Sequence, residues 1–238
     1  MNKKVLLLGA TLMASLLSAK ELSFKEVQEI AKLDMLVKSQ IIVEKAYLEN
    51  DIYMLKTNIR GQAQTLFLTK DKKNLIAGKV YNTKTSTELS IPNDISILKG
   101  KEGFSYGSGS DEYYLFTDPE CPYCKKFEAY LPQLKKHLKI NVFFFPLSFH
   151  KDAKELSYFI LSHKDKDAQA QAMFKAEASN EDFKNRSYKS GEKGQYIEMV
   201  DNHLKLGAQL GVRGTPTIYD SNGKSIVWTS LLEKYNIK

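Results

Sequence analysis

Cysteine is scarce in this chain of 238 residues, which contains only two, Cys121 and Cys124, separated by Pro122 and Tyr123. A second Cys-x-x-Cys pair is absent and the four histidines complete no finger-type spacing, which excludes the usual structural zinc sites. A bridge across so short a loop restrains the unfolded chain very little, so a purely structural disulfide is also disfavoured. Redox chemistry is the leading interpretation of this spacing.

The sequence also lacks an apolar run of the roughly 20 residues that a membrane span requires. The run from Val5 to Leu17 follows two lysines and precedes small residues, which is the pattern of a secretory signal peptide. We therefore expect residues 1–19 to be a signal peptide, with an uncleaved N-terminal anchor as the alternative. Export would place the mature chain in a compartment where disulfides persist.

Neither sign of charge dominates: 35 basic residues against 28 acidic ones give a formal net charge of +7. Loss of Lys3 and Lys4 with the signal peptide would leave 33 basic residues and a net charge of +5. The lysine-rich runs at 70–73 and 135–136 are short and typical of solvated faces, so we predict no nucleic-acid partner. Four histidines are interpreted as surface or helix residues and not as metal ligands: His137, His150, His163 and His203.

Residues 20–85 are predicted to form a small N-terminal domain. Apolar residues recur at helical spacing from Ser23 to Leu36, and Ser23 with Glu26 has the pattern of a capping box. The β-rich runs that follow lie at 41–43, 46–48, 52–55, 65–69 and 75–81, with a turn at 71–74 that predicts a hairpin. Such a unit buries little core alone, so we expect it to dimerise.

Residues 86–103 are interpreted as a linker with room for a short helix, and residues 104–238 as a second domain. In this domain buried strands are predicted at 113–117 and 141–147, with a helix between them and parallel pairing. The remaining predicted elements are a helical stretch at 152–178, a helix at 194–210 and strands at 217–219 and 225–228. This order is that of a thioredoxin-type fold with a helical insertion, in a chain of the α+β class.

The cysteine pair then falls at a strand-to-helix junction, where thiol–disulfide exchange is favoured. Unpaired N–H groups and the helix dipole at the N-terminus would stabilise a thiolate at Cys121. Pro122 suits the first helical turn, and Cys124, one turn deeper, should be buried and should resolve a mixed disulfide formed by Cys121. The charged neighbours are expected to be exposed and screened by solvent: Glu120, Lys125 and Lys126.

A second element of interest is the segment from Gly211 to Thr217. It contains a proline, Pro216, at the start of what otherwise reads as a strand, and this is unfavourable unless the proline has a special role. In the thioredoxin layout the bond before this proline is cis and lies beside the cysteine pair. Thr215 could then present its backbone to a substrate strand by edge pairing.

The runs Leu115–Phe127 and Gly214-Thr215-Pro216 resemble the DsbC/DsbG family of bacterial periplasmic disulfide isomerases, and residues 64–82 resemble the hairpin of that family's dimerisation domain. The resemblance implies a V-shaped homodimer in the periplasm, formed through a cystatin-like N-terminal domain. It implies no cofactor beyond the cysteine pair itself, and a membrane electron donor of the DsbD/CcdA kind. The residues carried over are Cys121 as nucleophile, Cys124 as resolving thiol, and Pro122, Tyr123, Thr215 and Pro216 as substrate-binding residues.

Two departures from the family pattern leave the substrate open. The Cys-Pro-Tyr-Cys core is closer to DsbG than to DsbC, and the second, structural cysteine pair of DsbC is missing. The expected partners are unfolded or misoxidised exported proteins, and the predicted activity is that of a disulfide isomerase or reductase. Oxidised single cysteines (sulfenic acids) are an alternative substrate.

Three rival functions stay open at this stage. A dithiol oxidase of the DsbA kind also uses a Cys-Pro-x-Cys pair, although it usually lacks an N-terminal domain such as residues 20–85. A reductase for cytochrome c maturation would be chemically similar, but the chain is not itself a c-type cytochrome because Lys125, not histidine, follows Cys124. A holdase chaperone is compatible with catalysis and could accompany it.

Overall fold

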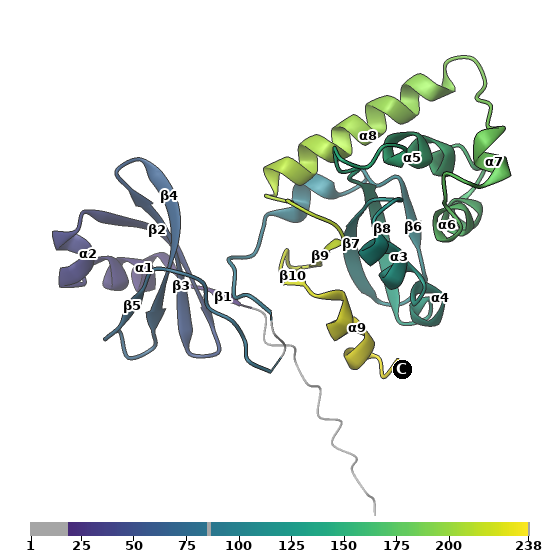
Figure 1. The fold of residues 1–238 in the computed structure, drawn as a ribbon. Coiled ribbons are helices and arrows are strands. Elements are labelled where there is room, and N and C mark those ends of the chain that lie inside the picture. The colour runs from purple at the N-terminus through teal and green to yellow at the C-terminus, as the bar shows by residue number, and fades with distance from the viewer. Residues whose placement is uncertain (1–18, 85–86, 238) are drawn as a thin grey trace, which may run out of the picture. The chain divides into compact units, whose positions relative to one another are not determined.

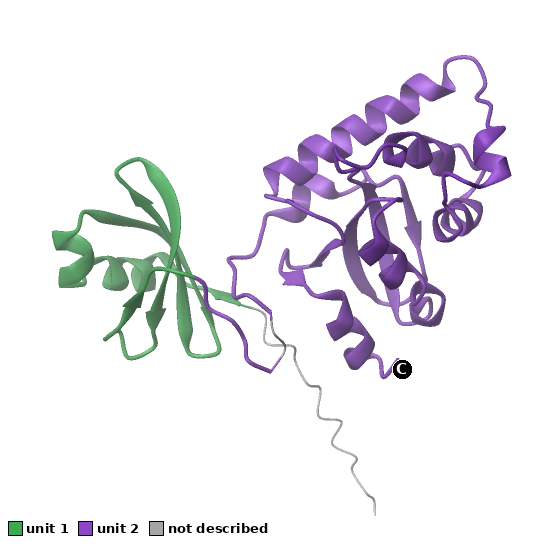
Figure 2. Ribbon diagram, viewed as in Figure 1, with its two compact units in different colours: residues 1–78 green, residues 79–238 purple. Residues whose placement is uncertain are grey.

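The structure, a computed structural model, describes residues 19–84 and 87–237. The predicted signal peptide lies outside these residues, apart from its last position. The chain divides into two compact units, one ending at Gly78 and the other beginning at Lys79, and each is described by itself (Figure 2).

The first unit is an antiparallel sheet of five strands in sequence order, with two helices packed on it (Figure 1). The two hairpin turns at its centre use positive-φ residues, as tight turns require: Asn50 and Asp51 in the first, Arg60 and Gly61 in the second. Its elements are β1 (Lys20–Glu21), α1 (Phe24–Ala31), α2 (Asp34–Lys38), β2 (Ile41–Glu49), β3 (Ile52–Ile59), β4 (Gln62–Thr69) and β5 (Leu75–Ile76).

Local signals in this unit act as predicted, with three corrections. The Ser23 capping box is present, with Ser23 N donating to Glu26 Oε2 over 2.7 Å. The single predicted helix is broken into α1 and α2, because the backbone of Leu33 is extended. The runs 41–43 and 46–48 are one strand, β2, with an irregular register after Val43, whereas the predicted strand 75–81 ends at Ile76.

The second unit is built on a five-stranded sheet in the order β10-β9-β7-β8-β6. Two adjacent inner strands, β7 (Asp111–Thr117) and β8 (Leu138–Phe144), run parallel, as the strand–helix–strand pattern predicted. The other three strands pair antiparallel: β6 (Phe104–Tyr106), β9 (Thr217–Asp220) and β10 (Ser225–Ile226).

Helices cover both faces of this sheet (Figure 1). The long helical stretch predicted at 152–178 is two helices, because the side chain of Asp165 accepts from Ala168 N and so caps a new helix. The final strand stops at Ile226 and Trp228 begins a helix, with the indole stacked on Tyr130. The helices are α3 (Pro122–Glu128), α4 (Leu131–Leu134), α5 (Ala153–Leu161), α6 (Lys166–Phe174), α7 (Glu181–Lys184), α8 (Glu192–Gln209) and α9 (Trp228–Lys234).

The alternation of side chains along β7 explains the layers. Leu115 faces a core shared with α3 and α4, while Phe116 faces a second core shared with the C-terminal part of α8. That second core also contains Ile95 and Leu98, which come from a short 3₁₀ helix, η1 (Ile95–Leu98). Part of the segment interpreted as a linker is therefore packed into the second unit. No helix in the described parts of the chain is both long and apolar enough to cross a membrane.

Candidate active site

The two cysteines lie at the junction between β7 and α3. Cys121 is the N-cap residue of α3 and Pro122 occupies its first turn, as the motif predicted. Cys121 is 4% exposed and Cys124 is fully buried, and both are free thiols. The turn before α3 is closed by the backbone N–H of Cys121, which donates to Asp118 O over 3.0 Å.

The loop before β9 brings a second segment to the dithiol from far along the chain. The Thr215–Pro216 peptide bond is cis. Cys121 Sγ donates to the carbonyl oxygen of Thr215 over 3.3 Å, which places this bond directly beside the exposed side of the pair. Thr217 Oγ1 holds the loop by donating to Gly214 O over 2.7 Å. The structure thus brings together Cys121, Cys124, Thr215 and Pro216, whereas the Tyr123 ring points outward and is 64% exposed.

The two thiols have different electrostatic surroundings. Burial raises the pKa of the Cys124 thiol to about 12, against the opposing influence of the Thr117 and Thr215 hydroxyls and the Asp118 N–H. Cys124 therefore holds its proton at neutral pH and needs an acceptor before it can attack. Cys121, at the end of the helix, is the thiol placed to meet a substrate first.

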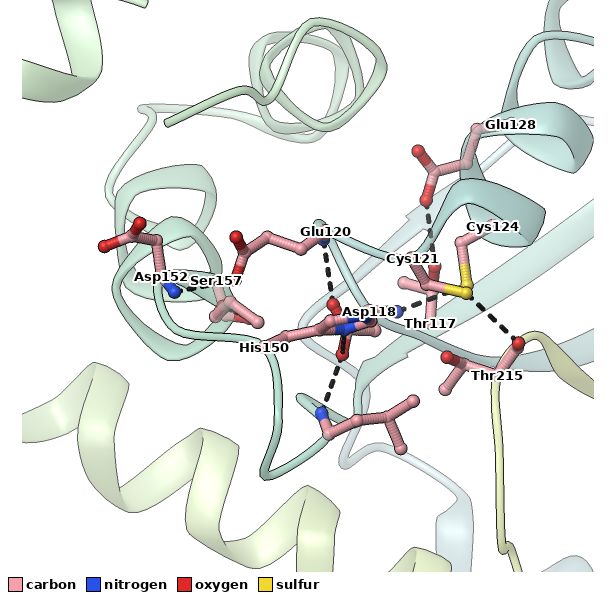
Figure 3. A network of polar contacts seen from close by, with 12 residues as sticks. Thr117, Asp118, Glu120, Cys121, Cys124, Glu128, His150, Asp152, Ser157 and Thr215 are labelled. Atoms are coloured by element: carbon pink, nitrogen blue, oxygen red, sulfur yellow. Dashed lines mark hydrogen bonds and ion pairs between the residues drawn. The ribbon is translucent and has the colours of Figure 1, made fainter. Parts of the chain in front are cut away.

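A buried polar network that the sequence did not predict lies beside the pair (Figure 3). Asp118 is fully buried, and its carboxylate accepts from Glu120 N over 2.8 Å and from Leu147 N over 2.7 Å. Its Oδ2 also lies 2.8 Å from Nδ1 of His150. Glu120 in turn accepts from Asp152 N over 2.6 Å, so it is held and not freely solvated, which corrects the expectation for Glu120. This network fixes the loop that precedes Cys121.

A second missed residue is Glu128, on the helix one turn after Cys124. Its carboxylate is 1% exposed and accepts from Thr117 Oγ1 over 2.8 Å. Lys125 Nζ lies 3.3 Å from Glu128 Oε2 and donates to Met173 O over 2.7 Å, so the expectation that Lys125 is exposed and screened is wrong. Burial raises the pKa of the Glu128 carboxyl, and Lys125 opposes that shift. The available signal was a glutamate next to Phe127, on the apolar side of the predicted helix.

Two further observations concern Lys126 and the potential metal ligands. Lys126 is exposed as expected, with its ammonium 5.6 Å from the centre of the Tyr123 ring. Within the described residues no group of three or more potential metal ligands comes together.

Comparison with known proteins shows which family the second unit resembles. A family model described as a thioredoxin-like domain matches residues 107–236. Among curated proteins, the thiol:disulfide interchange protein DsbC of Salmonella typhimurium strain LT2 is 26% identical over 165 residues, covering 66% of this chain. DsbC of Haemophilus influenzae is 26% identical over 184 residues, covering 72% of this chain and 73% of its own. This chain spans 65% of the length of the Salmonella relative.

Solved structures with a similar backbone include the catalytic domain of Proteus mirabilis ScsC, at 19% identity and a TM-score of 0.44, covering 59% of this chain and 92% of that one. A disulfide interchange protein from Neisseria gonorrhoeae matches at 22% identity and a TM-score of 0.42, covering 56% and 93%. The DsbC relatives confirm the resemblance found in the motifs. Because the family model covers more than half of its residues, this chain belongs to the thioredoxin-like domain family.

Proposed function

We propose that this protein is a thiol:disulfide interchange enzyme that isomerises or reduces wrongly formed disulfides in exported proteins. The observation that carries the proposal is the contact between Cys121 Sγ and the carbonyl of Thr215, next to a cis proline. It places the Cys121 thiol against the backbone of Thr215, so that an extended substrate pairing with this segment would meet the thiol. The DsbC relatives support the same reaction class.

The proposed reaction begins with attack by the Cys121 thiolate on one sulfur of a substrate disulfide. The α3 N-terminus, where backbone N–H groups lack helical partners, stabilises the anion before attack. A mixed disulfide forms between Cys121 and the substrate, whose other sulfur leaves as a thiolate. The substrate can then attack its own mixed disulfide, which completes isomerisation, or Cys124 can resolve it, which completes reduction.

We further propose that the first unit is a cystatin-like dimerisation domain, so that two dithiols would serve one substrate. Exposed apolar side chains in this unit support a partner surface: Phe24, Met35, Val37 and Ile42. The periplasm is the proposed location, with a membrane electron donor of the DsbD/CcdA kind to restore the dithiol. Chaperone activity, which the resemblance also implies, is proposed as an addition to catalysis.

A dithiol oxidase is the second candidate, because Cys-Pro-x-Cys pairs also serve oxidation. One experiment separates the two: reduced full-length protein is added to a scrambled multi-disulfide protein, and oxidised full-length protein to a reduced one. The isomerase proposal predicts recovery of native activity in the first reaction and slow oxidation in the second. Rapid oxidation without isomerisation would establish the oxidase instead, and reduction alone would favour a sulfenic-acid or cytochrome-maturation reductase.

A further inference from the structure

The second unit contains a positively charged hollow that thiol–disulfide exchange does not use. It has a volume of about 520 Å³ and lies where the first turn of α5, the end of α7, the loop after α7 and the start of α8 meet (Figure 1). Its lining combines one carboxylate, that of Glu155, with four cations: Lys184, Arg186, Lys189 and Lys193.

The excess of positive charge in this hollow remains when nearby acidic residues are counted. Lys184 Nζ lies 2.8 Å from Glu181 Oε1, and both side chains are exposed. Lys189 Nζ lies 3.9 Å from Glu192 Oε1, and the lysine is 88% exposed. Such exposed pairs are weak and open easily. With both of these carboxylates and Glu155 included, the cations still outnumber the anions, so the hollow favours an anionic ligand.

Two of the cations are held in position by Glu155. Lys193 Nζ lies 2.8 Å from Glu155 Oε1, and Arg186 donates to Glu155 Oε2 from Nε over 3.4 Å and from Nη2 over 3.3 Å. Arg186 Nη1 also donates to Phe183 O over 2.8 Å, and the guanidinium carbon lies 4.0 Å from the centre of the Phe183 ring. A guanidinium has five N–H groups and an ammonium three, so donors remain for a ligand. Their positions are set before the ligand arrives.

Tyr188 lines the same hollow and has a donor without an acceptor. Its hydroxyl oxygen is buried and has no hydrogen-bond partner among the described residues. Burial raises the pKa of this phenol, Glu155 adds to the shift and Arg186 opposes it, so the hydroxyl keeps its proton at neutral pH. Leaving a buried donor unpaired is costly. The carboxylate of Glu155 already serves Arg186 and Lys193, so an acceptor from a bound molecule is what this hydroxyl lacks.

We propose that this hollow binds a small soluble molecule that carries a phosphate group. A phosphate monoester has three terminal acceptor oxygens, enough to meet Arg186, Lys193 and Tyr188 at once, whereas a carboxylate has only two. Arginine also matches phosphate by donating two parallel hydrogen bonds. The volume of the hollow falls within the range of about 300–1,000 Å³ that is usual for small-molecule sites, so it has room for a polar organic part.

The first test measures phosphate binding to the full-length reduced protein. Inorganic phosphate and glycerol 3-phosphate are the probes, and sodium chloride at the same ionic strength is the control, because it screens charges without filling the site. By calorimetry we expect saturable binding of both probes with a Kd on the order of 1 mM or below. Both probes should raise the unfolding temperature at concentrations at which sodium chloride does not.

Charge variants locate the binding. Arg186→Gln and Lys193→Gln should each raise the Kd for phosphate by at least about tenfold, because each removes a charged hydrogen-bond donor. Lys205→Gln is the matched control, since it removes the same charge from an exposed position of α8 that does not line the hollow. Its Kd should stay within about twofold of the unmodified value.

Tyr188→Phe separates ligand binding from packing, because it removes only the hydroxyl. The Kd for phosphate should rise by about tenfold, since a hydrogen bond to a charged group is lost. Without phosphate the unfolding temperature should be unchanged or higher, because the hydroxyl has no partner to lose. A structural hydroxyl would give the reverse: a lower unfolding temperature and an unchanged Kd.

The inference is overturned if sodium chloride and phosphate raise the unfolding temperature equally, if Tyr188→Phe binds phosphate as tightly as the unmodified protein, or if Lys205→Gln weakens binding as much as Arg186→Gln. Should Arg186→Gln fail to fold, Lys193→Gln and Tyr188→Phe decide the question. Sedimentation with phosphatidylcholine vesicles that contain phosphatidic acid, lost in Arg186→Gln, would make a lipid headgroup the ligand and overturn the soluble one. Binding does not involve the dithiol, so it should persist in Cys121→Ala, and a failure of the proposed exchange reaction would leave this test intact.

Discussion

At the residue scale, the division of labour between the two thiols follows from their burial. Cys121 sits at the helix end against Thr215, and Cys124 is fully buried with its thiol pKa raised to about 12, chiefly by burial. An incoming disulfide therefore meets Cys121 first. The buried thiol acts only within the mixed disulfide, where it is held close to the sulfur that it must attack.

Replacing each cysteine by alanine should have opposite results. Cys124→Ala keeps the attacking thiol and loses the resolving one, so we expect a stable mixed disulfide with a protein substrate. Cys121→Ala loses the first attack and should form no adduct. Intact-mass spectrometry after acid quenching measures both. Equal adduct formation by the two variants would show that Cys124 is accessible to substrates, contrary to its burial.

The cysteines and the proline loop could be predicted from the sequence because their residue types are rare and their spacing is informative. Asp118, Glu128 and His150 could not. Charged residues beside a helix are normally solvated, and their burial here depends on partners elsewhere: Glu128 on Thr117, and Asp118 on His150, which is 32 positions away. Sequence spacing carries no record of such pairings.

At the element scale, helix α8 contains two glycines with opposite surroundings. A Cβ on Gly207 would lie 2.5 Å from a ring carbon of Phe145, whereas a Cβ on Gly194 would meet nothing within 4 Å. We expect Gly207→Ala to lower the free energy of unfolding by about 1–3 kcal/mol through overpacking. Gly194→Ala should raise it by about 0.5–1 kcal/mol, because alanine favours the helix. Urea unfolding measures both; a stabilising Gly207→Ala would contradict the packing of α8 on Phe145.

Helix α8 also contributes His203, which joins it to two other segments. Its Nδ1 accepts from Phe144 N over 3.1 Å, and Nε2 lies 2.8 Å from Lys101 O. Burial lowers the pKa of this imidazole to about 4, against an unfolded value of 6.5. Below pH 6.5 the His203 imidazole binds a proton in the unfolded chain but not in the folded protein. The free energy of unfolding therefore falls as the pH drops towards 4.

The size of this loss is about 3 kcal/mol across that pH interval. We expect the unfolding free energy of the unmodified protein to drop by that much more than the value for His203→Gln, whose side chain does not titrate. Urea titrations at pH 7 and pH 4 give the difference between the two proteins. Parallel pH dependences would mean that folding does not lower the pKa of His203.

Element types and order could be read from the sequence more reliably than element ends. The parallel pair β7 and β8 follows from two strongly apolar runs around a helix. The division of the stretch 152–178 depends on Asp165 serving as a cap, although an aspartate there is equally compatible with an exposed helix position. Strand β6 is three residues long and pairs with β8 from a distant part of the chain, so no local period marks it.

At the scale of the whole molecule, the place where the chain is cut should decide both stability and activity. The second compact unit begins at Lys79, and its core includes Ile95 and Leu98 from η1, ahead of the predicted domain start at Phe104. A fragment 104–238 loses both side chains. We expect its free energy of unfolding to be about 3–5 kcal/mol lower than that of a fragment 79–238. Urea unfolding of the two fragments measures the difference, and equal stabilities would mean that η1 adds nothing to this core.

The fragment 79–238 and the full-length protein should differ in isomerisation but not in the reduction of a simple disulfide. If dimerisation of the first unit is what allows isomerisation, the fragment 79–238 will reduce a simple disulfide within about twofold of the full-length rate, since the site lies wholly within it. The same fragment should fail to reactivate a scrambled protein, which needs a second dithiol or a shared binding surface. Sedimentation of the full-length protein must then show a dimer and that of the fragment a monomer. If the monomeric fragment isomerises as well as the full chain, the first unit is not needed for isomerisation and the dithiol of the second unit is sufficient.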